Sequence, residues 1–473
     1  MSHTHVHRLV LPLVFPEGIR PGAGKTGGNR LQLAKDGRGN AVLRGTALAG
    51  ALRHAYAAGL GVRSMDPQVA RWFGASCDGA GGDERGLPSP LKVSDLVLPV
   101  THTALRHHNA VDRHLGSVRP NGLFDVEVLP PGVCGKAVLL LETYEEDLDE
   151  ARAFLQALVG MFKDGLTLGG NAARGIGRAH LDAKVAYQIF DRGDLEQDAL
   201  FLEELHNLRK GTVPQTGEVL EPVASGRARL VVKFTLRVPR GQDLCVGDGQ
   251  GLDHEIEPQF VVDAQGKSFW KLPGSSLRGL FRGWCSRLAA KENFSLADSH
   301  QRAKDRRGHA ASGRDFAWGF MNEKQRIEIQ RILIEEFEVP PEQIVCPVMR
   351  LFGSSFSKGR IHISDALAPI QDATVTERKH VAVDRISGGA NDGFLFSNTV
   401  LHGSKLRFTV HLTIEHPEEH EARWIAKTLR ALDMGLLRVG SSKSGGRLAL
   451  DGRPTAQGPF SDAFKNITPL EGA

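Results

Sequence analysis

The chain repeats one of its own phrases. "RHHNAVDR" at residues 106–113 returns as "RKHVAVDR" at 378–385, so both stretches follow the pattern R-x-H-x-A-V-D-R. A repeat governs the whole fold prediction, because it implies two similar structural units in tandem. If the chain is duplicated, other phrases should recur in the same order.

Four more pairs of phrases recur, and all of them keep that order. They are "LRGTALAGALR" at 43–53 with "LPGSSLRGLFR" at 272–282, "WFG" at 72–74 with "LFG" at 351–353, "LKVSD" at 91–95 with "IHISD" at 361–365, and "LGGNAARGIGRAHL" at 168–181 with "VGSSKSGGRLAL" at 439–450. A Leu-Phe pair also follows the R-x-H phrase at the same spacing in both copies, at 123–124 and 395–396. The sequence therefore predicts a duplicated domain.

The domain boundaries follow from the segment between the two copies. Gly, Pro and Ser cluster there, just before an apolar run that predicts a strand. We expect a first domain at 1–215, a linker at 216–226 and a second domain at 227–473. The spacing between the copies lengthens after the first pair of phrases, which predicts an insert at about 283–345 with a helical stretch at 322–337.

Each copy mixes strand and helix patterns. Each opens with an apolar, strand-like run and carries an amphipathic helix before its glycine-rich phrase, at 148–162 and 418–434. Strand patterns fill most of the remainder. The sequence therefore predicts an α+β fold in which helices cover one face of an antiparallel sheet.

Composition excludes some classes of protein. The five cysteines form no CxxC pair, which predicts a reduced, intracellular protein without a disulfide framework or a cysteine-based zinc site. Neither a signal peptide nor an apolar run of about 18 residues is visible, so we expect a cytoplasmic protein without membrane contact. The net charge of +4 permits a polyanionic partner.

Two other stretches imitate known sites. "GIRPGAGKT" at 18–26 has one residue too many between its glycines for a phosphate-binding P-loop. "HTHVH" at 3–7 puts three histidines on one face of a strand, but no cysteine or acid completes a zinc site. The histidines are predicted to lie on the face of an edge strand.

The order of "PGSSLRG", "LFG", "ISDA", "AVDRISGGA" and a late glycine-rich loop resembles the RAMP superfamily. The closest resemblance is to the backbone subunits of type III CRISPR effector complexes. It covers nearly the whole chain and is better in the second copy. It implies two tandem ferredoxin-like, RRM-type RAMP domains with glycine-rich loops and β-hairpin thumbs, the thumbs at about 113–132 and 385–403. The implied partners are CRISPR guide RNA, single-stranded target RNA and other effector subunits.

Residues in the repeated phrases suit contact with an RNA backbone. A helix that opens at Gly274 offers N–H groups and hydroxyls to a phosphate, although plain helix capping is the alternative. Small residues in the glycine-rich loops let RNA approach, and nearby cations neutralise it. The candidate RNA-binding residues are Thr46, Arg53, Arg113, Arg174, Arg178, Ser275, Ser276, Arg278, Arg282, Arg385, Lys443 and Arg447.

Other residues of the R-x-H phrases keep two interpretations. Asp112 and Asp384 either contact RNA or form buried ion pairs with arginine that fix the hairpin. His108 and His380 either contact RNA or pack within the hairpin.

The resemblance further implies an acid before the PGSS helix that takes part in target cleavage. The substrate's own 2′-OH would attack, with Mg²⁺ or another divalent metal required. The candidates are Glu257, Asp253 and Glu255, of which Glu257 is closest to the family position and is also a candidate metal ligand. A solvated acidic loop is the alternative. In the first copy Asn29 and Arg30 stand where an acid is expected, so that copy is predicted to bind without cutting.

The resemblance, together with the acid-rich loop of the second copy alone, thus implies a double RAMP backbone subunit whose second domain cleaves target RNA. The alternative is a non-catalytic tandem subunit that caps the complex at its target-engaging end. A guide-processing ribonuclease would need a placed constellation of His, Tyr or Lys, and the sequence indicates none.

Overall fold

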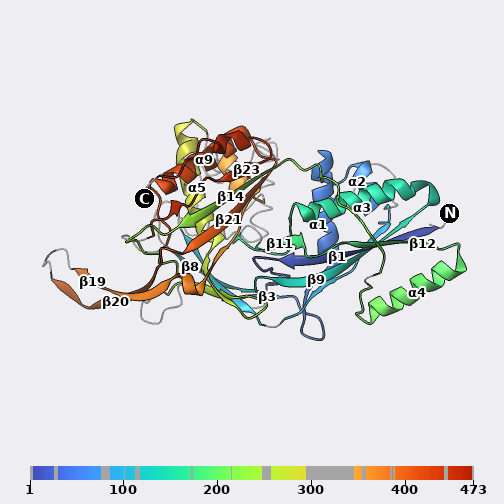
Figure 1. The fold of residues 1–473 in the computed structure, drawn as a ribbon, viewed down its shortest axis with the longest axis horizontal. Helices are drawn as coiled ribbons and strands as arrows, with labels where there is room; N and C mark the ends of the chain where they lie inside the picture. Colours follow the sequence, from blue (N-terminus) through green and yellow to red (C-terminus); the bar gives the residue numbers. More distant parts are fainter. Residues whose placement is uncertain are drawn as a thin grey trace, which may run out of the picture.

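The computed structural model shows two α+β units side by side (Figure 1). The described residues are 4–25, 30–75, 86–100, 102–111, 118–171, 174–214, 216–247, 257–294, 346–353, 358–383, 386, 389–440 and 446–470. Most of the predicted insert, with its helical stretch, lies outside them. Within these ranges, no helix combines the length and the apolar character needed to cross a membrane.

The first copy is built on a four-stranded antiparallel sheet. In spatial order its strands are β11 (Arg178–Leu181), β1 (His5–Phe15), β9 (Val133–Thr143) and β5 (Leu91–Val93). Helices α1 (Gly45–Leu60) and α2 (Pro67–Phe73) connect β1 to β5, and α3 (Leu148–Lys163) connects β9 to β11. This βαββαβ order, with the helices on one face of the sheet (Figure 1), is ferredoxin-like as predicted.

Apolar side chains from the sheet and the helices form the core of this copy. Leu9, Leu11 and Leu13 of β1 are fully buried with Leu155 and Leu158 of α3. Burial of such a side chain stabilises the fold by about 1.5–3 kcal/mol. Every second residue of this part of β1 is therefore buried in the same core as α3.

The second copy repeats the same arrangement. Its strand order is β22 (Ala449–Leu450), β14 (Arg229–Arg237), β21 (Arg407–Glu415) and β17 (Ile361–Ile363). Helices α5 (Gly274–Lys291) and α8 (Pro347–Phe352) precede β17, and α9 (Glu419–Asp433) follows β21. Because α5 runs to Lys291, the expected start of the insert at residue 283 falls inside this helix.

Further strands extend each sheet. In the first copy β12 (Ala186–Asp191) pairs with β1, β13 (Glu218–Val219) pairs with β12, and β10 (Leu166–Thr167) pairs with β11. In the second copy β23 (Thr455–Gln457) pairs with β14. Helix α4 (Leu195–Arg209) packs on β12. The predicted linker thus contributes β13 to the first sheet.

The position of β1 corrects one expectation about the histidines. β1 pairs with β9 on one side and with β11 and β12 on the other, so it is a central strand and not an edge strand. His7 is fully buried, with hydrogen bonds to Tyr187 Oη (2.7 Å) and Thr143 Oγ1 (3.0 Å). Burial lowers the pKa of His7 to about 4, with help from His5 and Arg152.

A long β-hairpin projects from each copy between its second and third core strands. The hairpins are β7 (Ala104–Val111) with β8 (Val118–Val128), and β19 (Thr374–Val383) with β20 (Ala390–His402). They begin before the expected starts at 113 and 385, so the R-x-H phrase forms the first strand of each hairpin. In both, the phrase histidine pairs with the phenylalanine of the Leu-Phe pair, and a register shift follows at the same point.

Short strands connect these elements. β2 (Gly22–Lys25) pairs with β3 (Arg30–Leu33), which runs parallel to β8. β4 (Ala41–Leu43) pairs with β6 (Leu96–Leu98). In the second copy β16 (Ser268–Leu272) lies between β15 (Phe260–Val262) and β18 (Ala366–Pro369). Within the described residues, 3₁₀ turns occur at Glu145–Asp147, Ile370–Asp372 and Ser461–Phe464.

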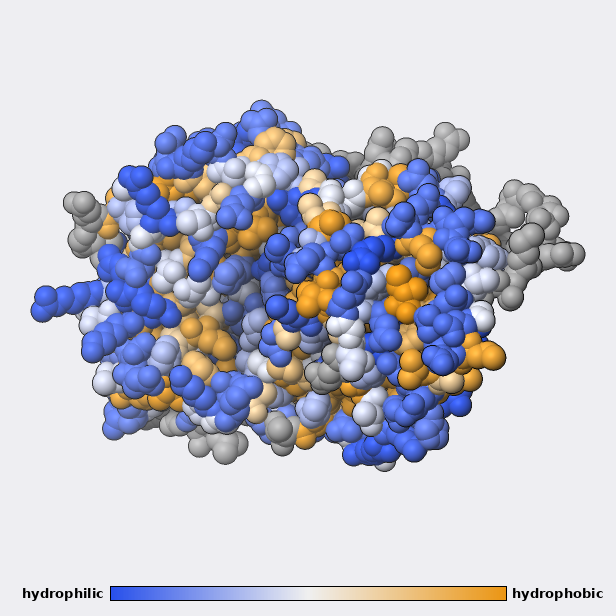
Figure 2. Space-filling view, turned by 45° about the vertical axis from the view of Figure 1, so that its right-hand side comes forward, coloured by the Kyte–Doolittle hydropathy of each residue, from blue (hydrophilic) through white to orange (hydrophobic). Residues whose placement is uncertain are grey.

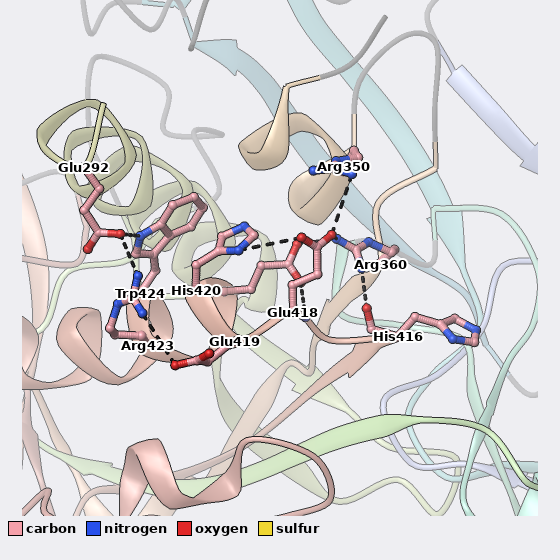
Figure 3. A network of polar contacts seen from close by, with 10 residues as sticks. Glu292, Arg350, Arg360, His416, Glu418, Glu419, His420, Arg423 and Trp424 are labelled. Atoms are coloured by element: carbon pink, nitrogen blue, oxygen red, sulfur yellow. Dashed lines mark hydrogen bonds and ion pairs between the residues drawn. The ribbon is translucent and has the colours of Figure 1, made fainter. Parts of the chain in front are cut away.

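A polar network joins α5 to α9 in the second copy (Figure 3). The Glu292 carboxylate accepts hydrogen bonds from Arg423 Nη2 (3.0 Å), Trp424 Nε1 (3.0 Å) and Lys427 Nζ (2.9 Å). Desolvation opposes ionisation of Glu292, but the bonds from Lys427, Arg423 and Trp424 outweigh it and lower the pKa to about 2. The network fixes the end of α5 and is structural.

Candidate nucleic-acid interface

One contact explains two of the repeated phrases. In helices α1 and α5, the N–H of the first residue donates a hydrogen bond to the aspartate of the Ser-Asp phrase in the same copy. The bonds are Gly45 N to Asp95 Oδ1 (2.7 Å) and Gly274 N to Asp365 Oδ1 (2.9 Å). A Cβ on Gly45 or Gly274 would clash with the carbonyl oxygen of the strand residue before that phrase. Glycine is therefore required for the helix to approach the strand so closely.

This contact bears on the phosphate-binding site that the sequence predicts at the start of α5. The Gly274 N–H is already bonded to a carboxylate, and Ser276 N donates to Pro273 O (3.0 Å). A carboxylate at a helix N-terminus also compensates the helix dipole. Helix capping by Asp365 therefore occupies the Gly274 N–H group, which is not free to bind a phosphate. The half-exposed side chains of Ser275 and Ser276 remain candidates for RNA contact.

The glycine-rich loops are tied to the segment that follows the first strand of each copy. Gly177 N donates to Gly18 O (2.8 Å), and Gly446 N donates to Asp243 O (2.8 Å). Gly177 and Gly446 have φ of +85° and +79°, in the left-handed region that favours glycine. The two loops are thus held by equivalent backbone contacts.

Asp365 connects the two copies. Its carboxylate forms an ion pair with Arg106 of β7 (2.6 Å), and the two side chains are only 1% and 8% exposed. Its backbone N–H donates to Gly175 O in the glycine-rich loop of the first copy (3.1 Å). The residue that caps α5 in the second copy is therefore held by the hairpin and the loop of the first.

The two R-x-H arginines use different partners. In the second copy Arg378 forms an ion pair with Asp243, which His402 Nδ1 also contacts at 2.7 Å. Both arginines thus neutralise a buried aspartate at the base of their hairpin. The repeated arginine is structural in each copy.

Three arginines meet where the two copies join. Arg20 follows β1, Arg174 lies in the first glycine-rich loop, and Arg278 lies on α5 of the second copy. Each has a buried guanidinium nitrogen without a hydrogen-bond partner in the described part of the chain: Nε of Arg20, Nη1 of Arg174 and Nε of Arg278. Burial lowers the pKa of Arg174 to about 10, and the positive charges of Arg278 and Arg20 add to the shift.

Aromatic rings lie beside these cations. The Arg174 guanidinium lies over the Phe124 ring at 4.6 Å, and His108 stacks on the same ring with centroids 5.3 Å apart. Burial lowers the pKa of His108 to about 3, with Arg174 next in effect. Of its two sequence interpretations, His108 therefore shows hairpin packing, as a neutral ring.

The acid-rich loop of the second copy can be aligned with the first copy by its hydrogen bonds. Gly247 pairs with Pro258 as Gly22 pairs with Leu33. Gln259 N donates to Val246 O (3.1 Å), as Ala34 N donates to Pro21 O (2.9 Å). This register makes Gln32 the structural equivalent of Glu257.

Glu257 and Gln32 therefore occupy the same structural position, with an acid in the second copy and an amide in the first. Both side chains are exposed, and each precedes a buried residue. The register corrects the expectation that Asn29 and Arg30 occupy this place in the first copy. Asp253 and Glu255 lie outside the described residues.

These equivalences agree with a comparison against known families. A family model described as the RAMP superfamily matches residues 11–180 and 243–448. The chain belongs to the RAMP superfamily. No curated protein matches it. The two matched regions fall in the two structural copies, so this is a double-RAMP protein, and membership associates it with CRISPR-associated complexes.

The other predicted site residues of the two RAMP copies differ in exposure. Thr46 is exposed on α1, whereas the Arg53 Nε donates to Ser64 O (2.8 Å). Arg178 is only 7% exposed and donates to Asp164 O (3.2 Å), so its side chain supports the fold and is not available to RNA. Arg282 and Arg447 are half-buried. The remainder lie outside the described residues: Asp112, Arg113, Asp384, Arg385 and Lys443.

Hydrophilic side chains cover most of the face shown in Figure 2, with smaller apolar patches between them. This distribution suits a polar partner such as nucleic acid better than a continuous apolar interface. Sequence reasoning missed Arg20 entirely, since the second copy has Cys245 at the equivalent position and the repeat gives no signal there.

Proposed function

We propose that this double-RAMP protein is a backbone subunit of a type III CRISPR ribonucleoprotein that binds guide RNA along both copies. The observation that carries the proposal is the cluster of Arg20, Arg174 and Arg278, whose buried nitrogens have no partners within the described ranges. Buried charge without a counter-charge is costly, so such a cluster suits an anionic ligand. Guanidinium groups match phosphate oxygens well and read no base sequence.

The second copy is proposed to cleave target RNA. The 2′-oxygen of one nucleotide attacks the adjacent phosphorus, the bond from phosphorus to the 5′-oxygen breaks, and a cyclic phosphate and a 5′-hydroxyl result. The exposed carboxylate of Glu257 orients or accepts the proton of that 2′-OH. Gln32 has no basic carboxylate, so the first copy binds RNA without cutting it.

A divalent metal belongs to this proposal. Mg²⁺ is bound in proteins through one or two carboxylates together with substrate phosphates and water. Glu257 fits as one such ligand. No group of three metal-ligating side chains occurs within the described residues, so RNA oxygens would supply part of the coordination. When bound, the metal would stabilise negative charge on the phosphate.

Guide binding is tested by measuring the affinity of the full chain for single-stranded RNA at several salt concentrations. We expect Arg20→Gln and Arg174→Gln each to weaken binding for every sequence and to reduce the salt slope by about one unit. The control is Arg209→Gln, at the exposed end of α4. Equal salt slopes for the wild type and the three variants would show that the arginine cluster does not contact RNA.

Cleavage is tested in the assembled complex with Mg²⁺ and a labelled complementary target. Cuts that depend on Glu257 support a nuclease. A complex that binds target without any cut in the wild type supports the alternative, a non-catalytic cap at the target-engaging end.

A further inference from the structure

The arginine cluster spans the joint between the two copies. Arg20 and Arg174 belong to the first copy and Arg278 to the second. Arg174 immediately precedes Gly175, whose carbonyl oxygen accepts the N–H of Asp365 across the joint (3.1 Å). Arg278 lies one helical turn after Gly274, which Asp365 caps. The cations therefore sit directly beside the contacts that dock the copies.

Like charges at this joint oppose docking. The nearby Asp365 carboxylate is already paired with Arg106. Arg20, Arg174 and Arg278 have no carboxylate partner among the described residues, and Arg20 is only 7% exposed. Charges that lie away from water interact more strongly than exposed ones. The repulsion between Arg278 and Arg174 therefore acts to separate the copies.

The chemistry of the cluster points to a phosphate group. Several guanidinium nitrogens from different elements can converge on one tetrahedral oxyanion, and each can donate a charge-assisted hydrogen bond. The ring of Phe124 is already in contact with Arg174 and His108, so this place offers charge and not a free surface for base stacking.

We propose that one phosphate group binds between Arg20, Arg174 and Arg278 and locks the two RAMP copies together. The inference rests on the proposed function for its ligand, a phosphodiester of bound RNA. The inference goes beyond the proposed function because it makes the rigidity of the joint depend on that ligand. A ligand that binds only the docked arrangement stabilises that arrangement by an amount that increases with the ligand's concentration and affinity. RNA binding and inter-copy docking are then linked.

Two backbone amides report docking in the full chain. Asp365 N donates to Gly175 O, and Ala264 N donates to Pro131 O (2.8 Å), so both bonds cross between the copies. Hydrogen exchange of peptides that contain them measures opening of the joint. Peptides from the β14 core, which contain fully or nearly fully buried residues such as Val232 and Phe234, serve as the internal reference. The probes are a mixed-sequence single-stranded RNA and inorganic phosphate.

We expect RNA to slow exchange of the Asp365 and Ala264 peptides at least about fivefold, with little change in the β14 reference. Arg174→Gln and Arg278→Gln, one in each copy, should both abolish this effect. Without RNA, Arg278→Gln should exchange more slowly than the wild type, because repulsion is relieved. Arg287→Gln, exposed on the same helix, is the matched control and should respond like the wild type.

The outcomes separate this inference from the proposed function. RNA that binds without slowing the two peptides overturns the lock and leaves RNA binding intact. If RNA does not bind but inorganic phosphate slows the peptides, the lock holds for free phosphate and the RNA proposal fails. If RNA does not bind and neither probe slows the two peptides, both are overturned.

Discussion

Arg106 in the first copy and Asp365 in the second form a 2.6 Å ion pair that is almost excluded from solvent. The equivalent aspartate of the first copy, Asp95, pairs instead with Arg44 at 2.9 Å, where the side chains are 42% and 63% exposed. The duplication thus provides the same aspartate in a buried and an exposed environment within one chain.

The first prediction concerns these two ion pairs. Arg106→Met should lower the free energy of unfolding of the second copy by about 3–5 kcal/mol, because it leaves the buried Asp365 carboxylate without a partner. Arg44→Met should cost less than about 1 kcal/mol, since exposed pairs contribute little. Urea titrations of both variants measure the difference. Equal losses would show that burial does not distinguish the two pairs.

The second prediction concerns the glycine that opens α5. Gly274→Ala should destabilise the protein by about 1–3 kcal/mol, because the new Cβ would collide with backbone carbonyl oxygens at the end of β17. Gly279→Ala, on the same helix with open space around it, should stabilise by about 0.5–1 kcal/mol. Thermal unfolding of the pair tests this. A neutral Gly274→Ala would mean that the helix can shift from the strand.

The third prediction concerns pH and Glu17. Burial raises the pKa of Glu17 to about 7, although Arg178 opposes the shift and Asp365 adds to it. The folded protein therefore binds a proton that the unfolded chain has lost, so this group's contribution to stability declines as pH rises from about 4.5 to about 7. Glu17→Gln should flatten that decline and increase stability at pH 8.

The exposed acid Glu221 provides the control for this measurement. Glu221→Gln should leave the pH dependence of unfolding unchanged, because the side chain is in solvent. If Glu17→Gln behaves in the same way, Glu17 is ionised in the folded protein at neutral pH.

Much of this fold could be predicted because the repeated residues make the same contacts in both copies. Gly45 and Gly274 recur because each must approach a strand closely. Asp95 and Asp365 recur because each caps the helix that begins at one of these glycines. The Leu-Phe pairs recur because each phenylalanine lies across the hairpin from a repeated histidine.

The remainder could not be predicted because it is not repeated. Arg20 is a cysteine in the second copy, so the comparison of phrases passes over it. The match of Gln32 with Glu257 depends on strand register and shares no letters on either side. The joint between Arg106 and Asp365 is a contact between copies, whereas the repeat describes only contacts within each one.

The most direct test of the account exchanges Glu257 and Gln32. In the assembled complex with guide RNA and Mg²⁺, cuts are mapped in a labelled complementary target for the wild type, Glu257→Gln and Gln32→Glu. We expect Glu257→Gln to abolish one cut, with a rate loss of at least about 100-fold, while target binding persists. Gln32→Glu provides the acid in the first copy and should add a cut at a second position. Wild-type cutting that survives Glu257→Gln unchanged would contradict the assignment of Glu257 and of the second copy as the nuclease.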